Sequence, residues 1–301
     1  MEPDIMNHLE HGKRPLQRLL AFDTSTSSLA VAVMENGKLL AEANIHAERN
    51  HSAYLVSAIG DVLAAAGIAK AELDGIAVGV GPGSYTGARI AVTTAKTLAW
   101  SLRLPLFGVS SLEAIALGGW ARSAGQDAAE LGGALSELAE AAKSDAASGN
   151  GGGTDGPAAA EQNRPAGDWI IPLVDARRGQ AYTALFAAEA GRMPERLEPD
   201  GIRLMASWTE QLAGLLNSLA PEDRPSGVWF VGETALHEPA VEALRPILGE
   251  ALHLIPYELE GIWVGLTGTR RALLRGGDDV HALEPNYTQL AEAEAKRLRE
   301  R

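Results

Sequence analysis

Apolar residues occur along the chain in short runs that predict strands, with one segment of clear helical spacing among them. Three such runs open the first half of the chain, at residues 18–23, 29–34 and 38–43. The Asn36-Gly37 pair between the last two runs is typical of a two-residue hairpin turn. Over residues 52–66 apolar positions recur three and four apart, and Gly67 is placed to end that helix. The pattern predicts a three-stranded meander followed by a helix.

A glycine-rich turn joins a strand to a helix in the rest of the first half. The predicted order is a strand at 74–78, the turn, a helix over 90–100 and a strand at 105–109. Gly81 and Gly83 flank Pro82 in this turn, which can therefore present several backbone N–H groups to an anion at the helix start. Neither GxGxxG nor GxxxxGKS/T is present, so close packing of the helix on its sheet is an equally good interpretation of these glycines.

The second half of the chain repeats the pattern of the first. Strands are predicted at 169–175, 180–186, 228–232 and 252–255, with a helix around 240–248. In each half the first strand ends in an aspartate, Asp23 or Asp175, and a polar turn follows it. Two copies of one βββαβ plan indicate duplicated domains. The arrangement resembles the actin, Hsp70 and sugar-kinase fold, which implies an α/β chain of two ribonuclease H-like domains with mixed sheets.

Changes in composition along the chain predict where the domains begin and end. We expect a disordered tail at 1–17, an N-terminal actin-like domain at 18–112, a C-terminal actin-like domain at 113–285 and a charged helix at 286–301. Residues 148–157 are too rich in glycine and polar residues to offset the entropy cost of ordering them. We therefore expect a flexible Gly-rich insertion at about 123–167 in the second domain.

Charge and cysteine content narrow the function classes. The 301 residues carry a formal net charge of −13 and include no cysteine, so disulfides and thiolate zinc sites are excluded. A strongly acidic chain lacks the basic face that nucleic-acid binding typically needs, so a partner must hold any RNA substrate. No apolar run approaches the roughly 20 residues of a membrane span. We expect a cytoplasmic protein with no membrane contact and no signal peptide.

The two polar turns form a candidate phosphate or nucleotide site. Its residues are Asp23, Thr24, Ser25, Gly81, Gly83 and Ser84. In kinases of this fold, carboxylates such as Asp23 and Asp175 face each other across the cleft and organise magnesium and phosphate. An aspartate followed by Thr or Ser also forms a turn of this kind without any ligand.

Four motifs, in this order along the chain, resemble the TsaB family, formerly called YeaZ. They are LAFDTST at 20–26, NHS at 50–52, GPGSYTGARI at 81–90 and GVSSL at 108–112. The resemblance implies a non-catalytic dimerisation and activating subunit of the bacterial complex that installs threonylcarbamoyl on tRNA. The modified base is the adenosine 3′ of the anticodon in tRNAs that read codons beginning with A. The implied partners are the catalytic paralogue TsaD and the P-loop ATPase TsaE, with tRNA bound only through the complex and no cofactor in this chain.

The resemblance also bears on catalysis, because the paralogue carries a His-x-x-x-His pair that holds its active-site metal. Two His one helical turn apart project from the same face of a helix and can coordinate one metal ion. The corresponding positions here are Ser111 and Ile115, and isoleucine cannot be a ligand. We therefore expect no catalytic residue and no metal on this face, and expect Ser110 or Ser111 to cap the helix, with Glu113 in its first turn.

We expect the function to lie on a helical partner surface. Its candidate residues are Tyr54, Leu55, Ala58, Ile59, Ala88, Ala91 and Ala95. Small residues three and four apart make a ridge that another helix can approach closely. Both helices must bury one stripe on their own sheet. Our hypothesis is that a second stripe, which includes Tyr54, Ala58 and Ala95, is left for TsaD and also supports a homodimer in isolation.

Two rival functions remain open from the residues. An ATP-dependent phosphotransferase of the same fold would bind ATP with magnesium and turn it over unaided. A metallopeptidase would hold a stoichiometric transition metal, which Ser111 and Ile115 disfavour.

Overall fold

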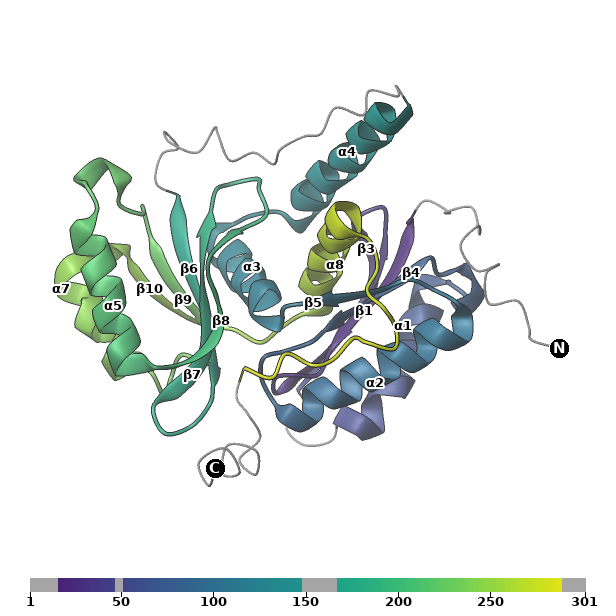
Figure 1. Ribbon diagram of the computed structural model, residues 1–301, viewed down its shortest axis with the longest axis horizontal. Coiled ribbons are helices and arrows are strands. Elements are labelled where there is room, and N and C mark those ends of the chain that lie inside the picture. The colour runs from purple at the N-terminus through teal and green to yellow at the C-terminus, as the bar shows by residue number, and fades with distance from the viewer. Residues whose placement is uncertain (1–15, 47–50, 148–166, 289–301) are drawn as a thin grey trace.

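The fold places two five-stranded sheets on either side of a central helical layer (Figure 1). The computed structural model describes residues 16–46, 51–147 and 167–288. The tail expected at 1–17 lies outside these ranges up to residue 15, as does the expected C-terminal helix from residue 289 onwards. None of the helices in the described ranges is long and apolar enough to cross a membrane.

The first sheet contains the predicted meander and the strands around the glycine-rich turn. Its strands are β1 (Arg18–Asp23), β2 (Ser28–Glu35), β3 (Lys38–His46), β4 (Gly75–Gly79) and β5 (Leu106–Val109), in the order β3-β2-β1-β4-β5. The pairs β1–β2 and β2–β3 are antiparallel, whereas β1–β4 and β4–β5 are parallel. Asn36 and Gly37 both have positive φ, 51° and 75°, as the predicted tight turn requires. Helices α1 (His51–Ala66) and α2 (Tyr85–Leu102) cover one face of this sheet.

The second sheet repeats the plan of the first. Its strands are β6 (Asp168–Asp175), β7 (Gln180–Ala188), β8 (Glu195–Leu204), β9 (Val228–Gly232) and β10 (Leu252–Pro256), in the order β10-β9-β6-β7-β8. Read from the other edge, this is the order of the first sheet, which confirms the duplicated, mixed-sheet fold. Strand β8 was not predicted, because its side chains are mostly exposed or half-buried and Pro199-Asp200-Gly201 interrupts its pattern.

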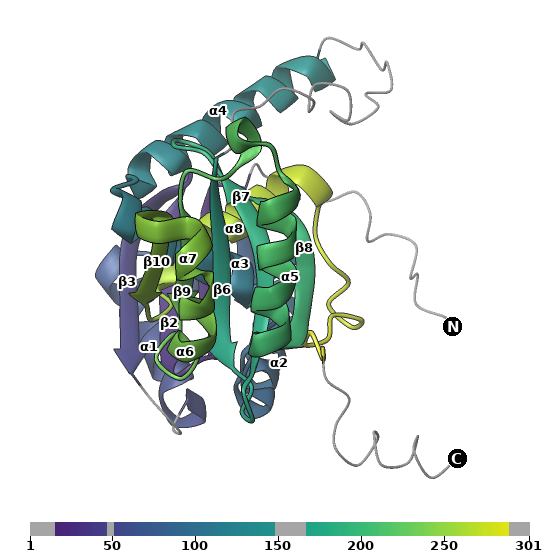
Figure 2. The same ribbon diagram turned by 90° about the vertical axis from the view of Figure 1, so that its left-hand side faces the viewer.

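Short helices cover the outer face of the second sheet (Figure 2). They are α5 (Met205–Ser218), α6 (Glu238–Val241), a 3-10 turn (Glu242–Leu244) and α7 (Arg245–Leu248). The single helix predicted around 240–248 is therefore divided, and Pro239 and Pro246 lie in the first turns of its two α-helical pieces.

Two central helices are exchanged between the domains. Helix α3 (Ser111–Ala124) packs on β6, β7 and β9 of the second sheet, and α8 (Gly261–Arg275) packs on β1, β2, β4 and β5 of the first. The expected boundary at 112/113 puts α8 in the C-terminal domain, but the helix covers the N-terminal sheet. One hydrophobic core, which includes Leu19, Trp120 and Phe186, runs through both inner faces.

The insertion expected at about 123–167 is partly a helix. Residues Ala128–Ala147 form α4, which contacts α8 and β3, and Leu131 and Leu135 are buried there. The expected flexibility is therefore wrong for 128–147, because these leucines give the helix an apolar stripe that the core covers. Residues 148–166, which include the glycine run, lie outside the described residues.

The segment after α8 runs back along the first sheet and crosses α2 (Figure 1). Asp278 bridges to Leu106 of β5, and the Asn286 N–H donates to the Val80 carbonyl at 2.7 Å. Lys96 Nζ donates to the carbonyls of His281 and Leu283, each at 3.0 Å. Residues 286–288, expected to begin a helix, are not helical.

Candidate functional site

The turn after β1 and the glycine-rich turn before α2 lie against each other, as the sequence predicts. The Thr24 hydroxyl donates to the Gly87 carbonyl at 2.7 Å, and the Ser84 N–H donates to the Ser25 carbonyl at 2.6 Å. The side chains of Asp23, Thr24 and Ser25 are fully buried. The Gly81–Pro82 peptide bond is cis. All six residues of the candidate phosphate site are thus brought together.

Close packing occupies the space between these two turns. A Cβ at Gly79 would overlap the Asp23 carboxylate, and Cβ atoms at Gly83 and Gly87 would overlap the carbonyls of Ser25 and Thr24. The cavity beside Gly83 measures about 30 Å³, a volume that fits about two water molecules. Helix and turn packing therefore accounts for the glycines that first suggested a phosphate cradle.

Asp23 anchors a buried hydrogen-bond network at the start of α3. The Ser111 hydroxyl donates to Asp23 Oδ2 and accepts from the Gly81 N–H at 2.9 Å. The Ser25 N–H donates to Asp23 Oδ1 at 2.5 Å. Ser110 is the N-cap of α3 and accepts from the Glu113 N–H at 3.2 Å, which confirms the predicted cap. Ser111 is thus a structural partner of the first turn.

The structure does not bring Asp23 and Asp175 together as the carboxylate pair that kinases of this fold suggested as one alternative. Asp23 is buried within its own domain, whereas Asp175 lines a cavity of about 390 Å³ between the domains. Ile115 lies on the wall of this cavity. The turn around Asp23 packs on α2 and α3 and thereby withdraws its carboxylate from the cleft.

The partners of Asp175 come from the turn after β9, which sequence reasoning missed. Glu233 accepts from the Asp175 N–H at 2.7 Å, and His237 Nε2 lies 3.3 Å from Asp175 Oδ1. Burial raises the pKa of Glu233 and lowers the pKa of His237, although the neighbouring Asp175 opposes the shift of the histidine. Strand β9 is the counterpart of β4 in the duplicated plan. The turn after β9 could therefore have been singled out as the counterpart of the glycine-rich turn.

Most of the expected partner-surface residues are buried on the inner sides of α1 and α2. Leu55, Ala58, Ile59, Ala88, Ala91 and Ala95 are each at most 4% exposed. All of these positions except Ala88 belong to the apolar cluster between the two helices and the first sheet, so the expected free surface at Ala58 and Ala95 is wrong. Tyr54 is 47% exposed and remains on the free face.

The accessible groove on α1 and α2 lies beside the buried stripe, on a more exposed side of the same two helices. It has a volume of about 520 Å³ and is lined by Leu55, Val56, Tyr85, Thr86, Arg89, Ile90, Thr93 and Thr94. Val56 is 68% exposed and Tyr85 is 52% exposed, which is unusual for apolar and aromatic side chains beside each other. Arg89 donates to the Tyr85 hydroxyl at 2.5 Å.

The duplicated sheets, the shared helical layer and the turns that face the interdomain cleft define an actin-like α/β protein. Within this class, the chain belongs to the TsaB family. A relative from Bacillus subtilis (strain 168), named tRNA threonylcarbamoyladenosine biosynthesis protein TsaB, is 34% identical over 282 residues. These residues are 92% of this chain and 96% of the relative, so the similarity runs through both domains.

Other similarities are concentrated in the first domain or in the fold. The Escherichia coli (strain K12) protein of the same name is 36% identical over 109 residues, 35% of this chain and 46% of that protein. The family model TsaD, described as tRNA N6-adenosine threonylcarbamoyltransferase, matches residues 43–130. A solved structure from Pseudomonas aeruginosa, described as similar to peptidase YeaZ, aligns with a TM-score of 0.60 at 22% identity. That alignment covers 91% of this chain and 100% of the other, and it shows a shared fold.

Proposed function

We propose that this chain is a non-catalytic subunit of a complex that forms threonylcarbamoyladenosine in tRNA, where it activates a transferase paralogue of the TsaD type. Membership of the TsaB family over both domains supports the pathway. The observation that carries the non-catalytic role is the packing of α3. Ser111 is buried and bonded to Asp23, and Ile115 is buried, at the two positions where the transferase is expected to hold its metal.

The groove on α1 and α2 is the proposed docking surface for the transferase. It joins the exposed apolar side chain of Val56 on α1 to the exposed aromatic ring of Tyr85 on α2. The small threonines Thr93 and Thr94 let a partner helix approach closely. A paralogue of the same fold presents an equivalent pair of helices. A second copy of this chain would use the same face, so homodimer and heterodimer compete.

The net charge of the chain and the proposed pathway indicate the other components of the complex. A net charge of −13 opposes binding of the tRNA backbone to this chain, so in this proposal the other subunits hold the RNA. The ATPase TsaE is the third protein component that we propose for the assembly. A site of action in the cytoplasm, where tRNA is modified, is part of the same proposal.

The test is reconstituted tRNA modification with transferase, ATPase, tRNA and an activated threonylcarbamoyl donor, with and without this chain. We expect product only when the chain is present. Val56→Arg places a charge at a 68% exposed position of the groove and should abolish both stimulation and co-elution with the transferase. Leu215→Arg is the control, because Leu215 is 42% exposed on α5, far from the groove in the fold.

Four outcomes would count against this proposal. Product formed by this chain without the transferase would make it the enzyme. Full modification in its absence would remove the activating role, and retained co-elution of Val56→Arg would place the interface elsewhere. Turnover of ATP with magnesium by the chain alone would favour the phosphotransferase alternative.

A further inference from the structure

One unpaired charge lies in the groove on α1 and α2. Arg89 is the only charged side chain among the residues that line this groove, and it is exposed. Its one side-chain hydrogen bond to a described residue goes to an uncharged group, the Tyr85 hydroxyl, at 2.5 Å. The guanidinium charge is therefore not neutralised within the described part of the chain.

An aromatic pair supports Arg89 in this position. Its guanidinium carbon lies 5.1 Å from the centre of the Tyr85 ring, within the range of a cation–π contact. Tyr287 packs on Tyr85, with the two ring centres 5.4 Å apart. Tyr287 belongs to the segment after α8, so the last described part of the chain supports a side chain of the groove.

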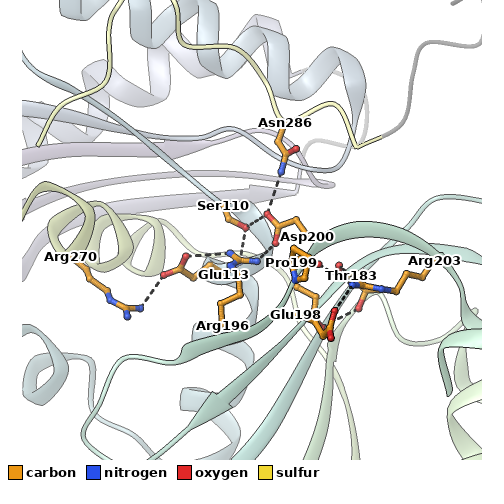
Figure 3. Close-up of polar contacts among 11 residues, drawn as sticks. Ser110, Glu113, Thr183, Arg196, Glu198, Pro199, Asp200, Arg203, Arg270 and Asn286 are labelled. Carbon is orange, nitrogen blue, oxygen red and sulfur yellow. Dashed lines mark hydrogen bonds and ion pairs between the residues drawn. The ribbon is translucent and has the colours of Figure 1, made fainter. Parts of the chain in front are cut away.

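The segment that carries Tyr287 is fixed on both sides. Lys96 on α2 holds it through two backbone carbonyls, each at 3.0 Å. On the second domain, Asn286 Nδ2 donates to Asp200 Oδ2 at 3.3 Å (Figure 3). Tyr287 therefore meets Tyr85 before any partner arrives, and less side-chain freedom is left to lose on docking.

A second copy of this chain offers no counter-ion for Arg89 in the groove. Helix α2 contains Arg89 and Lys96 but no acidic residue, and Asp61, the only acid of α1, does not line the groove. Docking of two copies through this face would therefore bury two guanidinium charges without carboxylates. Burying an unpaired charge opposes association, whereas a carboxylate in the partner would form a charge-assisted pair.

We propose that Arg89 makes this docking surface selective for a non-identical partner that presents a carboxylate to the groove. The planar guanidinium matches a carboxylate through two parallel hydrogen bonds, a geometry that no uncharged side chain reproduces. This selectivity rests on the proposed docking of a transferase at the same groove. It supplies the physical basis on which the transferase is preferred to a second copy.

The test compares two dissociation constants of the full-length chain, for the transferase by isothermal titration and for self-association by analytical ultracentrifugation. We expect Arg89→Gln to bind the transferase roughly tenfold more weakly, because one charge-assisted pair is lost, and to self-associate more tightly. Added salt should weaken transferase binding by the unaltered chain more than by Arg89→Gln. Arg103→Gln is the matched control, since it deletes the exposed arginine that follows α2 and lies outside the groove. It should leave both constants nearly unchanged.

Three results would overturn the selectivity of Arg89. They are equal weakening of both associations by Arg89→Gln, equal effects of Arg89→Gln and Arg103→Gln, and an unaltered chain that stays a homodimer in excess transferase. Each of these leaves the proposed function intact if Val56→Arg still abolishes transferase binding. Retained binding by Val56→Arg would instead remove the docking site itself. A thermal unfolding scan of each variant separates lost binding from lost folding.

Discussion

At the scale of single residues, the buried carboxylate of Asp23 determines how the first turn is built. It accepts from Ser25 and Ser111, and the missing side chain of Gly79 makes room for it. The sequence indicates a turn at Asp23 correctly, because an Asp followed by polar residues has few local alternatives. It does not reveal that the partner is Ser111, which is 88 residues away.

Gly79→Ala is expected to lower the free energy of unfolding by about 2–3 kcal/mol, since the new methyl group overlaps the Asp23 carboxylate. Urea unfolding followed by circular dichroism measures the change. Gly214→Ala in α5 is the control, because nothing lies within 4 Å of its added Cβ. That variant should gain about 0.5–1 kcal/mol. Equal effects of the two substitutions would contradict the packing of this turn.

His237 is expected to make stability depend on pH. Burial lowers its folded-state pKa below the ordinary value of 6.5, so the unfolded chain takes up the proton first as the pH falls. This contribution to stability is complete above pH 6.5 and is lost as the pH drops through 6.5 toward the folded-state pKa. His237→Gln should lose less stability than the unaltered chain on acidification from neutral pH, as urea unfolding at two pH values measures. If stability depended on pH equally in His237→Gln and in the unaltered chain, the predicted role of His237 would be contradicted.

At the scale of elements, helical spacing predicted α1 and α2 but not which of their faces stays free. The stripe of small and apolar residues, including Ala91 and Ala95, is the one that the sheet buries. Conversely, α4 was expected to be flexible because the glycine run beyond it dominated the composition of the segment. Its Leu131 and Leu135 lie one turn apart and pack into the core, which is enough to dock the helix.

Leu135→Ala is expected to weaken the docking of α4 by about 2 kcal/mol, because a buried leucine side chain is lost and a cavity remains. Hydrogen exchange should then be roughly thirtyfold faster for the α4 amides. Glu137→Ala changes an exposed residue of the same helix and should leave exchange nearly unchanged. Rapid, unprotected exchange of α4 in the unaltered chain would contradict its docking.

At the scale of the whole molecule, the exchange of α3 and α8 makes the two domains one cooperative unit. Helix α8 covers the inner face of the first sheet, although all five strands of the second sheet precede it in sequence. A single core cluster spans both sheets as a result. Neither half of the chain can therefore bury its sheet alone.

A fragment of residues 16–124 is expected to lack cooperative unfolding, because the face of the first sheet around Ala21 and Met34 is uncovered without α8. The same fragment joined through a flexible linker to residues 256–288 should regain a sigmoidal urea transition. Urea unfolding followed by circular dichroism compares the two fragments. Cooperative unfolding of the shorter fragment would show that α8 is dispensable to the first domain.

The sequence by itself determined the strand and helix periods, the hairpin turn at Asn36, the duplication of the plan and the family motifs. Each of these is written in residues close together along the chain, where local backbone preference and side-chain spacing decide the outcome. Only the tertiary structure decided that α8 crosses to the first sheet, that Asp23 and Asp175 stay apart, and that Tyr287 packs on Tyr85 beside the groove. These features depend on contacts between residues far apart in sequence, whose formation is governed by the packing of the shared core.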